Sequence, residues 1–381
     1  MSVFDLIDVP ALLDSTNQCI QCEACLEVCC TSGTADGPAM NPMERLTVIG
    51  RSLKGYAPLP DEVKALYYCT ECGRCDTVCP QEISISQTIA DGKVMMVKKG
   101  FGPLAKHDKM IAGLLKNRNA VGKPAEERLN WIPEHLRDKV RFEDAEGDTL
   151  LYVGCLSSYM DKATAAASLE ILMAAGENVK LLRDEYCCGI YPYNAGKWEE
   201  AKTIFTEMAE TFKKSGIKRI IVPCAGCHRA FSSYYPRLLE GFDIQVLHMA
   251  EVIKELLDAG RLTLNTTTQT VTVHDACKMG RKYGLYDIPR EILAACGATL
   301  TELPENRDQA LCCGSGAGVR SLDAPLSMKI AGKVLNTAEA DTLVSTCPFC
   351  IFNMNYTSRK TEAGKKAVHI ATLVKSAMVQ E

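Results

Sequence analysis

Short runs of apolar residues recur along the later part of the chain, and each run leads to a cysteine. The clearest runs are residues 150–153, 220–222, 271–273 and 343–344, which precede Cys155, Cys224, Cys277 and Cys347. Apolar, β-branched runs of this length are typical of strands that are buried on both faces. The pattern therefore predicts cysteines at the ends of buried strands.

Helical patterns lie between these runs. In residues 197–215, apolar side chains keep the i, i+3/i+4 spacing of a helix with one buried face, and Gly216 follows as a stop signal. The apolar positions are Trp198, Ala201, Phe205, Met208 and Phe212. Alternating strands and helices predict a mainly parallel, Rossmann-like sheet with helices on both faces. Such sheets bind ligands at the carboxyl ends of their strands, where we expect the cysteines to meet.

This α/β pattern occurs twice. Cys155, Cys187, Cys224 and His248 correspond to Cys277, Cys312, Cys347 and His369, and the offset in each pair is roughly 120 residues. We therefore predict duplicated α/β domains at residues 149–262 and 263–381. His248 and His369 begin paired helices, where capping or core packing is the expected role in preference to catalysis.

Length, composition and net charge indicate a globular protein and exclude some classes of partner. A chain of 381 residues with 47% hydrophobic residues can form two or three globular domains, and a net charge of −4 gives no reason to expect nucleic acid or an anionic membrane as partner. The N-terminal residues lack the features of a secretory signal, and no apolar run approaches the roughly 20 residues that span a bilayer. These features predict a cytoplasmic protein without a direct membrane span, which would reach the inner membrane face only through a partner.

Two cysteine runs occupy the first hundred residues, and a charged, helical linker is predicted at 101–148. The runs are Cys19, Cys22, Cys25 and Cys29, and then Cys69, Cys72, Cys75 and Cys79 with Pro80 after it. This spacing is that of bacterial ferredoxins, in which the fourth cysteine ligates the other cluster. Residues 1–100 are therefore predicted to be an α-helical ferredoxin module with two cubane 4Fe-4S clusters. One would be held by Cys19, Cys22, Cys25 and Cys79, and the other by Cys69, Cys72, Cys75 and Cys29.

Zinc and disulfides are the alternatives for these runs. Zinc gains nothing from a third cysteine at this spacing, and dense C-x2-C spacing in a reducing compartment favours metal ligation over disulfides. Cys30 stands where proline is usual in the pattern, and we expect a spare buried thiol there in preference to a ligand. Cys296 lies outside every cysteine set, and the sequence assigns it no role.

Each α/β unit carries five further cysteines. The first set is Cys155, Cys187, Cys188, Cys224 and Cys227, and the second is Cys277, Cys312, Cys313, Cys347 and Cys350. Adjacent cysteines can reach one centre only at a turn, and Gly189 and Gly314 permit the positive φ that such a turn requires. A vicinal disulfide is the alternative, although it would leave the other cysteines of each set without a purpose.

With these motifs the chain resembles the CCG-domain family of iron-sulfur proteins. Within that family it is most similar to the catalytic subunits of heterodisulfide reductases, either of the D type or of the C and B types fused into one chain. The most specific stretches are residues 274–281 (HDACKMGR), 286–290 (YDIPR), 312–319 (CCGSGAGV) and 347–350 (CPFC). The resemblance covers nearly the whole chain. It implies two CCG domains, each with a non-cubane 4Fe-4S cluster on its five cysteines, and an anaerobic, methanogenesis-type metabolism.

The resemblance also implies the chemistry of the site. The ten CCG cysteines would split a small-molecule disulfide of the CoM-S-S-CoB type between the two non-cubane clusters, and Lys278 stands where these enzymes often have a histidine that could donate a proton. Arg281, Lys282 and Arg320 are expected to bind anionic groups of the substrate, with Arg290 beside them; salt bridges to Asp275, Asp287 or Asp323 are the alternative. Tyr191, Tyr193 and Tyr286 could line a cavity, although packing is the expected role.

The predicted function is thus that of an iron-sulfur subunit in a hetero-oligomeric disulfide reductase. Because the chain has no dinucleotide or flavin fingerprint, its electrons would come from a separate flavin-containing reductase subunit or a membrane cytochrome b. The alternative is an electron-transfer subunit of a flavin-dependent 2-hydroxyacid or glycerol-3-phosphate dehydrogenase linked to a quinone.

Overall fold

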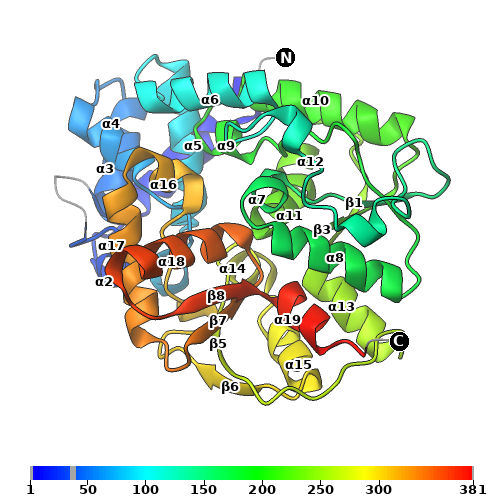
Figure 1. Cartoon of the computed structure of the whole chain (residues 1–381). Coiled ribbons are helices and arrows are strands. Elements are labelled where there is room, and N and C mark those ends of the chain that lie inside the picture. The colour runs from blue at the N-terminus through cyan, green and yellow to red at the C-terminus, as the bar shows by residue number, and fades with distance from the viewer. Residues whose placement is uncertain (1–2, 35–39, 380–381) are drawn as a thin grey trace.

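The computed structural model describes residues 3–34 and 40–379 (Figure 1). The helices of the N-terminal module lie on one side of the molecule, and the α/β part occupies the rest. The N-terminal elements are η1 (Val3–Leu6), α1 (Val9–Asn17), α2 (Ala24–Val28), α3 (Pro42–Leu53), α4 (Pro60–Tyr67), η2 (Asp76–Val78) and α5 (Ile85–Lys98).

Local sequence sets where these helices begin. The side chain of Asn41 accepts a hydrogen bond from the backbone N–H of Glu44 at 2.9 Å, and Pro42 occupies the first turn of α3. Helices α3 and α5 approach closely at Gly92, where a Cβ atom would lie 2.4 Å from the Cδ1 atom of Ile49. The module therefore packs its two longest helices together beneath the cysteine loops.

The first α/β half contains one four-stranded sheet. Its strands are β1 (Thr149–Leu151), β2 (Val179–Lys180), β3 (Arg219–Val222) and β4 (Gln245–His248). Its helices are α7 (Cys155–Tyr159), α8 (Lys162–Ala174), α9 (Ile190–Asn194), α10 (Trp198–Lys214), α11 (Ala225–Arg229), the π-helical η5 (Ala230–Tyr234), α12 (Tyr235–Leu238) and α13 (Met249–Asp258). Helix α10 matches the predicted helix to within one residue at each end.

The second half contains a sheet of the same size. Its strands are β5 (Thr270–His274), β6 (Thr299–Glu302), β7 (Thr342–Ser345) and β8 (Lys366–His369). Its helices are α14 (Gly280–Tyr283), α15 (Asp287–Ala295), η6 (Arg307–Gln309), η7 (Gly316–Gly318), α16 (Val319–Leu322), α17 (Ala324–Thr337), α18 (Pro348–Thr361) and α19 (Ile370–Ala377).

Both sheets are parallel and follow the same order along the chain. The orders are β2-β1-β3-β4 and β6-β5-β7-β8, so the four predicted apolar runs form the two central strands of each sheet. Central strands need apolar residues on both faces because helices cover both sides. The prediction of parallel sheets built from these runs is confirmed, and the cysteines follow the ends of the central strands.

One apolar core joins the two halves. Helix α8 of the first half packs against α19 of the second, and α13 packs against α15 and α19. The halves thus share buried side chains such as Ile171, Ile253 and Val374. This contact turns the cysteine-bearing edges of both sheets toward the same region of the molecule.

The segment predicted as a helical linker packs more closely than a solvated spacer would. Helix α6 (Ala105–Asn117) occupies its first part, and the remainder is irregular apart from η3 (Ala125–Glu127) and η4 (Glu134–Leu136). Trp131, Ile132 and Leu136 are buried in the core shared by the two halves. Helix α6 ends where Arg118 adopts a left-handed conformation with a φ of +59°, and the buried apolar side chains hold the rest of the segment against the domains.

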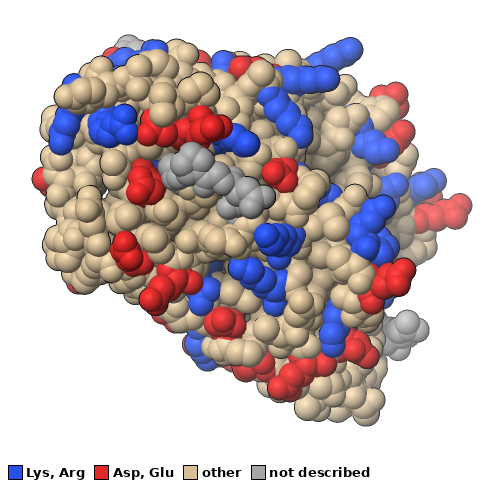
Figure 2. Space-filling model, turned by 90° about the vertical axis from the view of Figure 1, so that its left-hand side faces the viewer, with Lys and Arg blue, Asp and Glu red and all other residues tan. Residues whose placement is uncertain are grey.

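Figure 2 shows the face that carries the N-terminal helices. Lys and Arg side chains are interspersed there with Asp and Glu over a larger uncharged area. This mixture agrees with the net charge of −4. None of the helices within the described ranges combines the length and the apolar composition that a membrane crossing requires.

Two glycines provide a matched test of the contact between the ferredoxin module and the first α/β half. Gly196 and Gly216 both have positive φ, but a Cβ atom at Gly196 would lie 2.7 Å from the carbonyl oxygen of Lys93, whereas one at Gly216 meets no atom within 4 Å. Gly216→Ala should cost about 1 kcal/mol of unfolding free energy from backbone strain alone. Gly196→Ala should cost about 1–3 kcal/mol more, because α5 must move. Urea unfolding of both variants measures the difference, and equal losses would contradict the close packing.

Candidate functional site

The two five-cysteine sets line a single cavity of about 130 Å³ between the halves. All ten cysteines of these sets contribute to its wall: Cys155, Cys187, Cys188, Cys224, Cys227, Cys277, Cys312, Cys313, Cys347 and Cys350. Each of these ten side chains except that of Cys277 belongs to a buried residue, and Cys277 is half-buried. The strand ends and the turns that follow them therefore bring together residues that are as far apart in sequence as Cys155 and Cys350.

The paired cysteines lie at the turns predicted from the sequence. Gly189 and Gly314, which follow the two pairs, have φ values of +74° and +80°. A Cβ atom at Gly314 would lie 2.5 Å from the carbonyl oxygen of Ser327, so the turn needs glycine for its space as well as its conformation. Asn353 of α18 also holds this turn, because its Nδ2 donates to the carbonyl oxygen of Cys313 at 2.6 Å.

A buried ion pair fixes the turn before Cys155. The carboxylate of Glu185 accepts hydrogen bonds from the backbone N–H groups of Val153 and Gly154, each at 2.9 Å, and pairs with Arg128. Both charged side chains are at least 95% buried. Sequence reasoning missed these two residues, since Arg128 lies in the segment predicted to be a linker. The acidic residue two positions before the cysteine pair was the available signal.

Neighbouring thiols change the acidity of the paired cysteines. Hydrogen bonds from Cys187 and Cys227 lower the pKa of Cys188 to about 6. In the second half, hydrogen bonds from Cys312 and Cys350 lower the pKa of Cys313 to about 6. Hydrogen bonds from Cys224 and Cys350 also lower the pKa of Cys347. Each set therefore contains at least one thiol that is readily deprotonated, as a soft metal ligand must be.

Two histidines link the halves close to the cavity. The Nδ1 atoms of His248 and His369 accept from the backbone N–H groups of Ala250 and Ala371, each at 3.1 Å, so both histidines cap helices as expected. Each Nε2–H therefore remains to donate. Nε2 of His248 lies 2.9 Å from the carbonyl oxygen of Thr346, and Nε2 of His369 lies 2.9 Å from that of Pro223.

These cross-links are reciprocal. Thr346 precedes Cys347 and Pro223 precedes Cys224, so the helix cap of each half holds the cysteine turn of the other. Burial lowers the pKa of His248 to about 3, and both histidines are neutral near pH 7. The pair therefore positions Cys224 against Cys347 through neutral hydrogen bonds.

The cations predicted at the site have different surroundings. Lys278 lines the cavity, and its Nζ donates to the carbonyl oxygen of Glu71 at 3.0 Å, while burial lowers its pKa. Arg281 donates to the carbonyl oxygens of Cys72, Asp308 and Ala310, and Lys282 pairs with Asp76 at 3.0 Å.

Arg320 and Arg290 are also placed away from the cavity wall. The guanidinium of Arg320 lies over the Tyr356 ring, 4.3 Å from its centroid, and Arg290 pairs with Asp275 and Glu302. Among the described lining residues, Lys278 is the one Lys, Arg, Asp or Glu. The geometry thus brings Lys278 to the ten cysteines, whereas Arg281, Lys282 and Arg320 make contacts within the protein.

Polar groups without partners also face the cavity. Ser157 Oγ, Asn194 Oδ1 and Ser315 Oγ are buried, line the cavity and make no hydrogen bond within the described part of the chain. Tyr191 lines it as well and bonds to Nδ1 of His107 at 3.0 Å. Tyr193 instead stacks on Trp198, and a Cβ atom at Gly280 would meet the ring of Tyr286 at 2.3 Å, so both tyrosines serve packing.

The N-terminal cysteines line two smaller cavities. One is lined by Cys19, Cys22, Cys25 and Cys79, and the other by Cys29, Cys30, Cys69, Cys72 and Cys75. These are the two crossed sets expected from the ferredoxin spacing, with Cys30 added to the second. Arg45 reaches this second cavity from α3, where its guanidinium donates to the Cys29 sulfur at 3.9 Å and to Thr31 Oγ1 at 2.9 Å.

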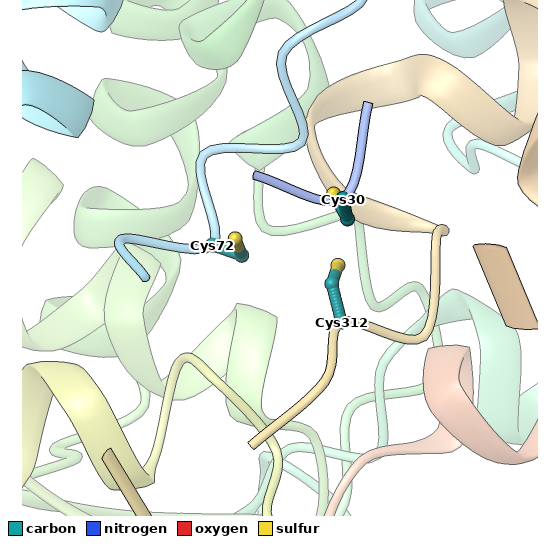
Figure 3. Close-up of side chains that lie close together, drawn as sticks. All are labelled: Cys30, Cys72 and Cys312. Atoms are coloured by element: carbon teal, nitrogen blue, oxygen red, sulfur yellow. The ribbon is translucent and has the colours of Figure 1, made fainter. Parts of the chain in front are cut away.

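Cys30 extends toward the central cavity. The sulfur atoms of Cys30, Cys72 and Cys312 all lie within 4.8 Å of one another, and the three residues come from three separate segments of the chain (Figure 3). Cys72 belongs to the second N-terminal cavity, while Cys312 belongs to the central one. Cys296, by contrast, is fully buried at the end of α15 and lines neither cavity.

The donor set fits iron-sulfur clusters. All twenty cysteines are free thiols, so the vicinal disulfides weighed above are not formed. Eighteen of them, grouped as predicted, could hold metal, and soft thiolates in closed, apolar surroundings select iron-sulfur clusters or zinc. Five convergent thiols exceed the four ligands of a structural zinc site, which favours clusters in the central cavity.

Comparison with known proteins supports this assignment. A family model described as a cysteine-rich domain, CCG, matches residues 149–232 and again 271–355, and one described as a 4Fe-4S dicluster domain matches residues 15–83. The chain is 30% identical to the D subunit of the dihydromethanophenazine:CoB–CoM heterodisulfide reductase of Methanosarcina mazei, over 89% of this chain and 88% of the relative.

Two further relatives are named for different functions. The chain is 29% identical to the EtfAB:quinone oxidoreductase of Syntrophomonas wolfei, over 76% of this chain and 43% of that protein. It is 26% identical to the B subunit of the fumarate reductase (CoM/CoB) of Methanothermobacter marburgensis, over 82% of this chain and 61% of that protein. Two of these three names denote subunits, which indicates a hetero-oligomeric setting for such chains.

The histidine cross-links can be separated from the helix caps by substitution. His369→Asn keeps a good capping side chain but cannot reach Pro223, whereas His369→Ala loses both interactions. We expect each variant to lose about 1–2 kcal/mol of unfolding free energy from the broken cross-link, and His369→Ala to lose about 1 kcal/mol more. Urea unfolding of both variants measures these losses of unfolding free energy. The corresponding variants His248→Asn and His248→Ala are measured in parallel. Wild-type stability in His369→Asn would show that the cross-link contributes nothing.

Proposed function

Because the chain belongs to the CCG-domain iron-sulfur family, which includes the D subunit of heterodisulfide reductase, we propose that it acts as the iron-sulfur subunit of a disulfide reductase. One observation carries this proposal, namely that both complete five-cysteine sets open onto the same cavity. A relay protein needs its redox groups in sequence along a path. A cavity shared by two redox groups instead suits a single disulfide substrate, because each group can react with one of its two sulfur atoms.

We propose that the chain holds four clusters. The N-terminal sets would hold two cubane 4Fe-4S clusters, and the two CCG sets would hold two non-cubane 4Fe-4S clusters on five thiols each. The equal strand orders and the paired landmarks support an origin of the two CCG halves by duplication. When bound, the clusters would supply the two electrons that cleavage of a disulfide requires and would provide sites for the two sulfur atoms.

The residues of the chain have separate tasks in this scheme. The apolar wall, with Leu156, Ile190 and Phe349, would exclude water and thereby strengthen electrostatic interactions inside the cavity. Lys278 would hold a proton beside the product thiolate, since the residue lines the cavity and the carbonyl oxygen of Glu71 fixes its Nζ. Ser157, Asn194 and Ser315 would bind polar atoms of the substrate.

A disulfide of the CoM-S-S-CoB type is the substrate that we propose, because the names of the heterodisulfide reductase relatives refer to it. Among the residues that the structure describes, the cavity wall offers one cation, Lys278, to such a molecule. The sulfur–sulfur bond and its neighbouring methylene groups would therefore occupy the cavity, and the anionic groups of the substrate would lie beyond the described wall or pair with Lys278.

A separate protein would supply the electrons. A flavin-containing reductase subunit or a membrane cytochrome b would bind the chain in a hetero-oligomeric complex, on the side of the ferredoxin module. The likeness to the EtfAB:quinone oxidoreductase favours a second candidate function, in which the chain passes electrons between a flavoprotein and a quinone and binds no substrate itself.

Disulfide turnover distinguishes the two functions. The iron-replete protein should oxidise reduced viologen anaerobically when the CoM-S-S-CoB heterodisulfide is added, with two viologen molecules consumed per disulfide. Viologen absorbance follows the reaction, and an iron count establishes that all clusters are present. A fully loaded protein that leaves this disulfide and simple alkyl disulfides unreduced would instead be an electron relay.

Ligand substitution should locate the chemistry in the central cavity. Cys188→Ser and Cys313→Ser each remove a thiol with a lowered pKa from one set, and turnover should fall to background because one of the two redox groups is lost. Cys296→Ser is the matched control, since this buried thiol lies outside every set and should keep full turnover. Both active-site variants should retain the electron paramagnetic resonance signals of the cubane clusters. Undiminished turnover in either one would contradict the assignment.

A further inference from the structure

A sulfur-rich junction lies between the ferredoxin module and the second CCG half. Cys30, Cys72 and Cys312 bring their sulfur atoms within 4.8 Å of one another, from three segments of the chain (Figure 3). Cys72 is a predicted ligand in the ferredoxin module, and Cys312 is one in the CCG half. Cys30 belongs to neither predicted ligand set, although it fills the space between the two.

Thr70 completes the junction. Its Oγ1 atom lies 3.5 Å from the Cys30 sulfur and 3.5 Å from the Cys312 sulfur, and the residue is 2% exposed. A ligating thiolate at Cys312 could only accept a hydrogen bond. The hydroxyl of Thr70 would then donate to Cys312, and the thiol of Cys30 would donate to Thr70 Oγ1.

The surrounding contacts hold this arrangement in place. A Cβ atom at Gly316 would lie 2.2 Å from the carbonyl oxygen of Thr70, so the glycine-rich loop rests directly on the cysteine loop of the ferredoxin module. Arg281 donates to the carbonyl oxygen of Cys72 at 2.8 Å, and Lys278 donates to that of Glu71 at 3.0 Å. Three consecutive residues of the loop are thereby held by the second half.

Resting on the proposed function, we propose that Cys30 and Thr70 are positioning residues at the point where electrons enter the second cysteine set. Electrons supplied by the donor protein would cross from the Cys72 side to the Cys312 side one at a time. Cys30 keeps its proton, and no bond forms or breaks at the junction. Hydrogen bonds to ligand sulfur raise the reduction potential of a cluster, so this network would make the transfer favourable.

Substitution of Thr70 tests the hydrogen bond while preserving shape. Thr70→Val keeps the volume but removes the hydroxyl, whereas Thr70→Ser keeps the hydroxyl. In a potentiometric titration followed by electron paramagnetic resonance, Thr70→Val should shift the potential of the second-set cluster to a more negative value. Thr70→Ser should restore most of the wild-type value, and the first-set cluster is the internal reference. An unshifted second-set potential in Thr70→Val would overturn the proposal.

Substitution of Cys30 tests the path. We expect Cys30→Ala to slow the arrival of electrons at the second set by about tenfold, measured by rapid freezing after mixing with reduced viologen, and Cys30→Ser to recover part of this rate. Cys296→Ala is the control and should transfer electrons at the wild-type rate. An unchanged rate in Cys30→Ala, or an iron count lower by one cluster, would refute the role, since the second result would make Cys30 a ligand.

Both measurements omit the disulfide, so they are independent of turnover. A shifted potential together with absent turnover would leave the junction in place and refute the disulfide reductase function. Disulfide turnover together with unshifted potentials and unchanged electron-transfer rates would refute only the proposed role of Cys30 and Thr70.

Discussion

The reciprocal contact between the two CCG halves is the constraint on which the rest of the site depends. Each half alone ends its central strands in cysteine-bearing turns, but one cavity arises only because the two sets of turns face each other. The shared apolar core holds the two halves together. Across their boundary, His248 bonds to Thr346 and His369 bonds to Pro223, which fixes the position of each cysteine turn relative to the other half. Because these bonds are buried and neutral, their geometry does not vary with pH near neutrality.

Much of this arrangement could be predicted from the sequence, since local patterns encode it. Apolar runs before cysteines predicted the central strands, and the spacing of the N-terminal cysteines predicted the two crossed sets that line separate cavities. The turns at Gly189 and Gly314 were predicted because two adjacent cysteines can reach one centre only at a turn, and the glycine after each pair has the positive φ that the turn requires. Each of these inferences starts from a short motif whose residues are close together in the chain, even where the groups it brings together, such as Cys19 and Cys79, are not.

Contacts between residues that are far apart in the chain could not be predicted from the sequence. Arg281 and Lys282 were expected to contact substrate because they follow a cysteine of the site, yet their partners are Cys72 and Asp76 of the ferredoxin module. The charge and Pro content of residues 101–148 predict a helical linker with a solvated face, but the segment also contains buried apolar residues such as Trp131 and the buried Arg128. The sequence shows that a Lys or Arg lies close to a site cysteine along the chain. Only the fold determines which carboxylate or carbonyl group that side chain contacts.

The loop around Cys72 has a consequence for how the protein is made. Its carbonyl groups are held by Lys278 and Arg281, and the residues joined by the first of these bonds are 207 positions apart. During synthesis the N-terminal module therefore leaves the ribosome long before the residues that close it. Insertion of iron and sulfide at the Cys72 loop must then either wait until Lys278 and Arg281 have been made or proceed on an open loop that is later enclosed. In both cases the module made first reaches its final form only after the second half has begun to form, and its oxygen-sensitive thiols need protection until then.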